Sequence, residues 1–255
     1  MLDGVQLRAL PGIAEIQPGD DLAAIIRQSL TDHNQPLADN SVLVVAQKIV
    51  SKAEGRLVRL CDVSPSARAV ELSEITKKDP RLVELVLSES TAILRAVPGV
   101  MIVRHRLGYI MANAGIDQSN LPGNVDGEQA LLLPIDPHQS AHNLRLALTT
   151  QSGAHPGVII SDSFGRPWRN GVVNVALACS GIPALIDQSS QPDRHGRILQ
   201  HTVIAYADAI AAGAALVMGE SAEGTPVAIV TGLHSTAPIN DANAIIRPLE
   251  SDLFQ

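Results

Sequence analysis

Three groups of polar residues follow apolar stretches of the sequence, and their side chains are suited to bind a cation or a phosphate. They span residues 47–55, 117–120 and 162–169. Carboxylate oxygens such as those of Asp117 and Asp162 are ligands that Mg²⁺ and Mn²⁺ prefer, and the Ser163 hydroxyl could add another oxygen. Each aspartate could equally cap a turn, because Asp and Ser are ordinary turn residues. These residues by themselves leave both interpretations open.

Lys52 is a candidate phosphate ligand in the first polar group. It follows a predicted strand and precedes the sequence AEGR. A lysine there can meet a phosphate as a point charge, although a solvated surface lysine is the commoner case. The chain has neither a GxxxxGK[ST] nor a GxGxxG motif, so neither a P-loop nor a dinucleotide-type Rossmann site is predicted. The eight histidines show no HExxH spacing, and we interpret them as surface or structural residues.

The composition favours an α/β fold without nucleic-acid binding. The chain has 255 residues, enough for one large domain, and only 2% of them are aromatic. Its core must therefore be built from Ala, Val, Ile and Leu, which suits helices packed on mixed sheets. The formal net charge is −7 and there is no basic tract, which argues against general nucleic-acid binding.

Cysteine spacing and hydropathy favour a cytoplasmic protein. Cys61 and Cys179 lie far apart without a CxxC spacing, so neither a disulfide framework nor a zinc site is indicated. The N-terminal sequence MLDGVQLRALPG has no apolar core of the length that a secretory signal requires. The longest apolar run, residues 209–218, is about half the length of a membrane span. We expect no association with a membrane.

Hydrophobic periodicity and capping residues predict alternating strands and helices. We predict helices over 18–30, 64–72, 79–97, 171–185 and 208–218, and another that begins at 136–137. We predict strands at the start of 41–55, as a hairpin over 100–115, and over 157–161, 198–207 and 225–233. No repeat or linker divides the chain, so we expect a single domain over residues 1–255 whose two lobes interleave. The strand that begins at Gly157 is expected to end at Asp162, with Gly165 turning the chain away.

Six segments together resemble the coenzyme F-420 γ-glutamyl ligase family. They are LPGIAEIQPGDDL, KIVSKAEGR, RLGYIMANAGIDQSN, LLPIDPHQSA, ISDSFGRPWRNG and LVMGESAEGTPVAIVTGL. They occur in the family's order and cover nearly the whole chain. Each segment alone is a weak signal, but the combination of VSKAEGR, AGxDxSN and SDSFGRPWR is highly specific.

The resemblance implies a role for individual residues. It assigns guanine-nucleotide contacts to Leu10, Pro11, Gly12, Ile13, Gln47, Lys52, Asn120, Met218, Gly219, Glu220, Ser221, Ala222, Glu223, Gly224 and Thr225. It implies that Asp117 and Asp162 hold a divalent metal and that Ser163 is a ligand of a second one, with Glu220 at a metal-ligand position that varies among relatives. Asp117, Asp162 and Lys52 would carry the catalysis.

The activity implied by the resemblance is a GTP-dependent addition of L-glutamate to the deazaflavin precursor F-420-0. It would use Mg²⁺ or Mn²⁺, sometimes with K⁺, and an acyl phosphate is the expected intermediate because a carboxylate is a poor electrophile. The family resemblance also implies an intertwined homodimer. Two other functions stay open, namely another nucleotide-dependent acid–amine ligase on this scaffold and a nucleotide- or metal-binding module without turnover. Arg166 and Arg169 carry no family assignment; they either contact the phosphodiester or carboxylates of the acceptor or form a structural salt bridge.

Overall fold

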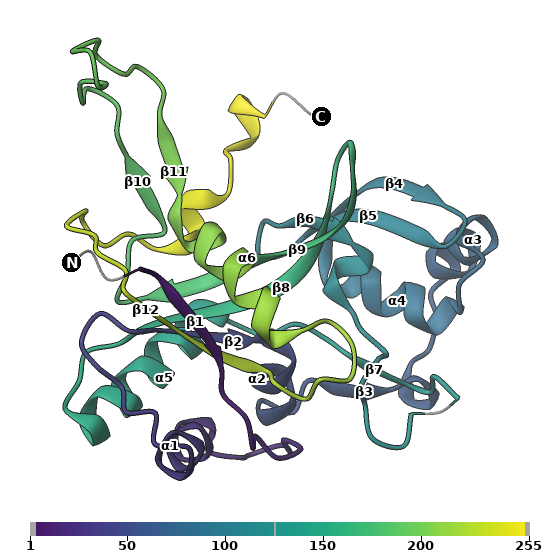
Figure 1. The fold of residues 1–255 in the computed structure, drawn as a ribbon. Helices are drawn as coiled ribbons and strands as arrows, with labels where there is room; N and C mark the ends of the chain where they lie inside the picture. Colours follow the sequence, from purple (N-terminus) through teal and green to yellow (C-terminus); the bar gives the residue numbers. More distant parts are fainter. Residues whose placement is uncertain (1–3, 125, 253–255) are drawn as a thin grey trace.

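A five-stranded mixed sheet forms the centre of the fold in the computed structural model, which describes residues 4–124 and 126–252 (Figure 1). Its strand order is β1-β12-β2-β8-β9. The strands are β1 (Gln6–Ala9), β2 (Val42–Ala46), β8 (Gly157–Arg166), β9 (Arg169–Ser180) and β12 (Val227–Thr231). β2 and β8 run parallel, with Ala46 opposite Ser161. The next residue on each chain, Gln47 and Asp162, therefore emerges at the same edge of the sheet.

Helices cover both faces of this sheet. On one face lie α1 (Leu22–Asp32), α2 (Gln47–Ala53) and α5 (Pro137–Ser152), and on the other lies α6 (Tyr206–Met218) (Figure 1). The side chains of β8 alternate between the two cores: Ile160 packs with the first group of helices, whereas Ile159 packs with α6. The first part of β8, residues 157–160, is buried on both faces and reads as a continuous apolar run, as such strands do.

The second lobe is built from residues 57–131, inserted between α2 and α5. It contains a three-stranded sheet of β4 (Ser90–Val97), β5 (Val100–His105) and β6 (Ile110–Ala112), covered by α3 (Ala67–Thr76) and α4 (Pro80–Ser88). The short pair β3 (Leu57–Arg59) and β7 (Gln129–Leu131) connects it to the main sheet region, and single 3₁₀ turns lie at Leu60–Asp62 and Asn113–Gly115. The prediction of a hairpin over 100–115 is confirmed.

A two-stranded ribbon, β10 (Leu185–Asp187) and β11 (Val203–Ala205), projects away from the body (Figure 1). The long loop between its strands is mostly exposed. After β12, the chain forms two 3₁₀ turns at Ala242–Ile245 and Leu249–Ser251. In the described residues, no helix has the length and apolar character needed to cross a bilayer.

Two helix ends follow the predicted capping chemistry. Asp136 accepts a hydrogen bond from the backbone N of Gln139, with Pro137 in the first helical position of α5. α6 ends at Gly219, as predicted. The helix predicted over 18–30 instead begins at Leu22, and Asp21 caps it by accepting from the backbone N of Ala24.

Two of the predicted helices are wrong over part or all of their length. Residues 171–185 form most of β9 instead of a helix, because the β-branched residues Val172, Val173 and Val175 pair with β8 across a long hairpin. The helix predicted over 79–97 ends at Ser88, and residues 90–97 form β4. In both cases strand pairing, a tertiary interaction, overrides the local apolar pattern.

The chain around the polar groups also differs from expectation. The polar stretch after β2 is the helix α2. β8 continues through Asp162 and Ser163 to Arg166, so the strand does not end at the carboxylate, and the chain turns at residues 167–168 rather than at Gly165. Trp168 adopts the left-handed conformation in this turn, with φ of 58°.

Candidate active site

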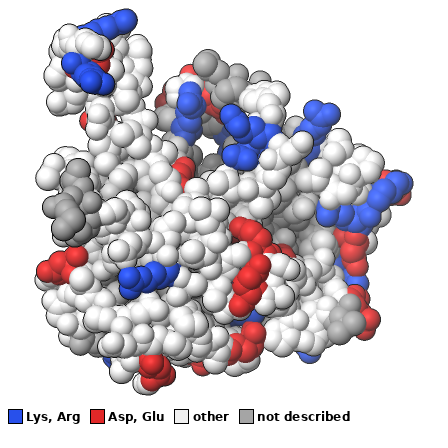
Figure 2. Space-filling model, viewed as in Figure 1, with Lys and Arg blue, Asp and Glu red and all other residues white. Residues whose placement is uncertain are grey.

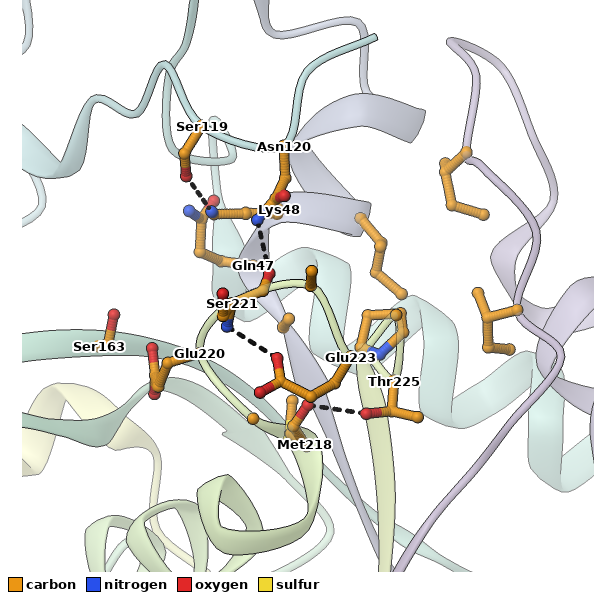
Figure 3. Close-up of a pocket in the computed structure, with 18 of the residues that line it drawn as sticks. Gln47, Lys48, Ser119, Asn120, Ser163, Met218, Glu220, Ser221, Glu223 and Thr225 are labelled. Carbon is orange, nitrogen blue, oxygen red and sulfur yellow. Dashed lines mark hydrogen bonds between the residues drawn. The ribbon is translucent and has the colours of Figure 1, made fainter.

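A cavity of about 500 Å³ opens at the sheet edge where β2 gives way to α2 (Figure 3). Five segments distant in sequence line it: residues 13–16, residues 46–52, residues 117–120, the facing parts of β8 and β9, and the loop 218–226. All three polar groups of the sequence contribute to it. The register of β2 and β8 explains why two of them meet, since both strands deliver their polar residues to one edge.

Asp117 is held by a lysine from α2. The Lys48 ammonium forms an ion pair with the Asp117 carboxylate and also donates to Ser119 Oγ at 2.9 Å. The backbone N of Ser119 donates to the same carboxylate at 2.8 Å. Burial raises the pKa of Asp117, but these donors outweigh it, so that the pKa lies below its usual value. Asp117 therefore remains ionised at neutral pH.

The pKa of Asp162 is shifted in the opposite direction to that of Asp117. Burial, together with the nearby Asp117 carboxylate, raises the pKa of Asp162 to about 7, although the Ser163 backbone amide, Lys48 and Gln47 act in the other direction. In the described part of the chain Asp162 forms no salt bridge. The cavity thus holds a carboxylate that is short of positive charge, which is a common property of functional sites.

Lys52 points into the same region one helical turn after Lys48. Its ammonium forms an ion pair with Glu15 at 2.5 Å and donates to the Asn120 carbonyl at 2.9 Å. The Lys52 side chain is only 12% exposed, so it is not an ordinary surface lysine. Two ammonium groups on one face of α2 give the cavity the capacity to bind a phosphate chain.

The loop after α6 closes one side of the cavity and is fixed by its own hydrogen bonds (Figure 3). The Glu223 carboxylate accepts from the backbone N of Ser221 at 2.8 Å, and Asn120 Nδ2 donates to the Ser221 carbonyl at 3.1 Å. Gly219 has a φ of 76°, and a Cβ at this position would overlap the Glu223 side chain. Glycine is therefore required for this loop conformation.

The oxygen atoms in the cavity fit a hard cation. Besides Asp117 and Asp162, the cavity presents the hydroxyls of Ser161 and Ser163 and the side chain of Asn174. Among the described residues, no three His, Cys, Asp or Glu side chains gather closely enough to hold a metal ion. A cation bound here would therefore take hydroxyl, amide, water or phosphate oxygens beside the carboxylates, as Mg²⁺ usually does.

Most of the predicted site residues meet at this cavity. Those that line it are Ile13, Gln47, Lys52, Asp117, Asn120, Asp162, Ser163, Met218, Gly219, Glu220, Ser221, Ala222, Glu223, Gly224 and Thr225.

Five singled-out residues lie elsewhere. Leu10 is fully buried in the hydrophobic core, and the Pro11 carbonyl accepts from Ser29 Oγ at 2.5 Å. Gly12 lies against the His33 ring. Arg166 and Arg169 face each other across the end of the β8–β9 hairpin and do not line the cavity.

Five polar or charged cavity residues were not singled out individually from the sequence: Glu15, Lys48, Ser119, Ser161 and Asn174. Lys48 could have been found from its spacing, since a lysine four residues before Lys52 shares its helical face. Finding it required predicting α2 as a helix. The sequence did not identify Asn174 as a site residue, because residues 171–185 were predicted to form a helix and not the strand β9 that pairs with β8.

Comparison with known proteins places this α/β chain in one family. The sequence model of the F420-0:Gamma-glutamyl ligase family matches residues 12–232, and the chain belongs to that family. It is 41% identical to a protein of Methanopyrus kandleri named coenzyme F420:L-glutamate ligase. The alignment spans 258 residues and covers 100% of this chain and 99% of that protein. Proteins of the same name from Methanothermobacter thermautotrophicus and Halorubrum lacusprofundi are 39% and 42% identical, over 99% and 89% of this chain.

Proposed function

We propose that this chain is a GTP-dependent ligase that adds L-glutamate to F-420-0 in the biosynthesis of coenzyme F-420. The family membership and the names of the relatives support ligation of glutamate. The observation that carries the finer proposal is the joint position of Lys48, Lys52, Asp117 and Asp162 in one cavity of suitable size. Two ammonium groups can bind the phosphates of a nucleoside triphosphate, and two carboxylates can bind the metal ions that accompany it.

The reaction is an activation followed by an amide-bond formation. A carboxylate oxygen of F-420-0 attacks the γ-phosphorus of GTP, the bond to the β-phosphate oxygen breaks, and GDP leaves with that electron pair. The α-amino group of L-glutamate then attacks the acyl carbon. The bond from carbon to phosphate oxygen breaks, inorganic phosphate leaves, and the nitrogen loses a proton to give the amide. The net products are glutamylated F-420-0, GDP and phosphate.

The residues of the chain bind and orient the nucleotide in this scheme. Lys52 and Lys48 attract the phosphates of the nucleotide. The phosphates would then replace Glu15 as the partner of Lys52 and Asp117 as the partner of Lys48. The loop 218–225, fixed by Glu223, supplies the wall against the nucleotide. Asp117, Asp162, Ser163 and Glu220 would hold two divalent cations, Mg²⁺ or Mn²⁺. When bound, these would neutralise phosphate charge and align the donor.

We further propose a cytoplasmic homodimer. The projecting ribbon and the loop between its strands expose Ile198, Val203 and Ile204, which are 54%, 49% and 39% exposed. Exposed apolar residues on a two-stranded ribbon are a typical contact surface for a second copy of a chain. Sedimentation equilibrium distinguishes a dimer from a monomer, and we expect Val203→Glu with Ile204→Glu to shift the protein toward the monomer.

A phosphate-release assay tests the ligase proposal. We expect phosphate only when GTP, Mn²⁺ or Mg²⁺, L-glutamate and F-420-0 are all present, with the glutamylated product seen by mass spectrometry. Release with another acid in place of F-420-0 would indicate a different acid–amine ligase on this scaffold. Binding of GTP and Mn²⁺ without release under any combination would indicate a binding module and contradict the proposal. K⁺ against Na⁺ in the same assay tests the expected monovalent cation.

A further inference from the structure

Asn174 places a buried amide oxygen at the wall of the cavity without a hydrogen-bond partner. The residue is only 6% exposed, yet its Oδ1 has no partner among the described residues. Buried polar atoms in native proteins are nearly all paired, so each exception calls for a physical reason. Because Asn174 lines the cavity, a bound ligand can be that reason.

Strand register shows toward which side of the cavity Asn174 projects. Asn174 on β9 lies directly opposite Ser163 on β8, and paired residues of antiparallel strands project from the same face of a sheet. Ser161, two residues earlier on β8, projects from that face as well, and its Oγ is also buried without a partner. Three neutral oxygens therefore face one side of the cavity.

Glu220 adds a carboxylate to these oxygens. In Figure 3 the Ser163 hydroxyl and the Glu220 carboxylate lie on the side of the cavity away from Gln47 and Lys48. The two cavity lysines are engaged elsewhere, Lys48 with Asp117 and Lys52 with Glu15. Among the described residues, the oxygens on the Ser163 side form no hydrogen bond or ion pair with a lysine, whereas the Asp117 side has the Lys48 ammonium group.

We propose that Asn174 supplies an amide-oxygen ligand to a divalent cation bound on the Ser163 and Glu220 side of the cavity. This assignment rests on the proposed function, because the cation would serve the same nucleotide site. Amide and hydroxyl oxygens with one carboxylate form a hard-oxygen set, which binds Mg²⁺ and Mn²⁺ when phosphate or water completes the shell. Asn174 then has its missing partner when the cation is bound.

Direct measurement of Mn²⁺ binding tests this assignment without relying on activity. Free Mn²⁺ is followed by electron paramagnetic resonance during titration of the protein with Mn²⁺ alone and with Mn²⁺ plus GDP. We expect the wild type to bind two ions and Asn174→Ala to bind the weaker one about tenfold less tightly, with the tighter one unchanged. Asn170→Ala is the matched control, because Asn170 lies on the same strand but outside the cavity.

Asn174→Asp is the second variant, since it keeps an oxygen and adds charge. We expect it to bind Mn²⁺ at least as tightly as the wild type, and to gain more in melting temperature on addition of Mn²⁺ than either Asn174→Ala or the control. This variant is nearly isosteric, so it reports on the site even if Asn174→Ala folds poorly.

Several outcomes would overturn the assignment. The first is an Asn174→Ala titration curve that matches that of the wild type, and the second is a wild type that binds a single Mn²⁺ ion. The third is an Asn174→Ala variant that differs from the wild type in its response to K⁺ but not in its affinity for Mn²⁺. The proposed ligase activity fails separately: a wild type that binds two ions with Asn174 dependence but never glutamylates F-420-0 retains the ligand assignment and loses the function.

Discussion

Two enclosed carboxylates of this chain, Glu89 and Asp162, differ in the number of positive groups around them. Glu89 accepts hydrogen bonds from Arg56 Nη2 and Arg106 Nε, both at 2.9 Å, and His105 Nε2 lies 3.4 Å away. Burial raises the pKa of Glu89, but the nearby His105 ring and the hydrogen bonds from Arg56 and Arg106 outweigh it and lower the pKa to about 2. The protein itself supplies every charge that Glu89 needs.

Asp162 lacks such partners, and burial raises its pKa to about 7. The comparison separates a carboxylate that is fully paired within the fold from one that lacks a counterion, as the proposed cation site requires. A saturated cluster gains nothing from a ligand, whereas an underpaired carboxylate in an open cavity gains a counterion when a cation binds. The Glu89 cluster also connects parts of the fold, since Arg56 donates to the Leu133 carbonyl and Arg106 to the Ile135 carbonyl.

Glu89→Gln is expected to have the largest effect on stability. It removes the charge that compensates two partly buried arginines, which costs about 3 kcal/mol in the free energy of unfolding. Urea denaturation measures this loss, and Mn²⁺ affinity should not change. Glu71→Gln is the control, because Glu71 pairs with Arg68 on the exposed surface and should cost less than about 1 kcal/mol. Equal losses of unfolding free energy in Glu89→Gln and Glu71→Gln would contradict the distinction between the buried Glu89 cluster and the exposed Arg68–Glu71 pair.

The same cluster predicts an acid dependence of stability. The pKa of Glu89 is depressed from 4.5 to about 2, so its contribution is fully present above pH 4.5 and is lost as the pH falls toward 2. The difference in unfolding free energy between wild type and Glu89→Gln should shrink by up to about 3 kcal/mol over this range. Denaturation curves of both proteins between pH 6 and 2.5 measure it, and a constant difference would contradict the assigned ion pairs.

Asp162→Asn should affect function and leave the fold intact. It keeps the shape but removes the charge that offsets a cation, so Mn²⁺ affinity falls and turnover falls by about a hundredfold, even at saturating metal. Stability without metal should change little or rise, because the repulsion from Asp117 is removed. Calorimetry and a metal titration of turnover measure both effects.

Asp208 is the matched control for that experiment. Burial raises its pKa as well, but it accepts from the backbone N of Ala176 at 2.9 Å and does not line the cavity. Asp208→Asn should lose about 1 kcal/mol of stability at most and keep normal Mn²⁺ affinity. Full recovery of turnover by Asp162→Asn at the wild-type metal concentration would contradict its role as a metal ligand.

Lys52→Ala tests the cationic side of the cavity. Removing one ammonium from the phosphate site should raise the KM for GTP about tenfold, with little change in the KM for L-glutamate. Lys78→Ala, in the second lobe, is the control and should leave both constants unchanged. Steady-state kinetics with each substrate varied in turn measure the effect, and an unchanged KM for GTP would exclude Lys52 from the nucleotide site.

Arg169→Ala is expected to have the smallest effect. If the hairpin arginines contact the anionic acceptor, the KM for F-420-0 should rise a few-fold, while stability changes by less than about 0.5 kcal/mol because Arg169 is exposed. Arg68→Ala on α3 is the control for loss of an exposed arginine. A lower melting temperature with an unchanged KM for F-420-0 would show that Arg169 is a structural surface residue.

Local chemistry was sufficient to predict much of the fold and most of the cavity. The helix starts at Asp136 and Asp79, the hairpin over 100–115 and the end of α6 at Gly219 were all predictable, because caps and turns depend on neighbouring residues. The polar groups that follow β2 and interrupt β8 were visible as candidate ligands for the same reason. Their residue types made them candidate ligands for phosphate and hard cations, but were equally compatible with turn caps.

Only the tertiary structure decided how those groups meet. The parallel register of β2 and β8 brings Gln47 beside Asp162, and pairing with β9 converts a predicted helix into the strand that carries Asn174. Lys48 became a partner of Asp117 only because α2 is a helix that faces a loop 69 residues later in the chain. Strand pairing and burial are interactions between distant residues, so their energies are absent from any local window of sequence. The pKa values of Glu89 and Asp162 diverge for this reason, although both begin as ordinary carboxylic acids in the chain.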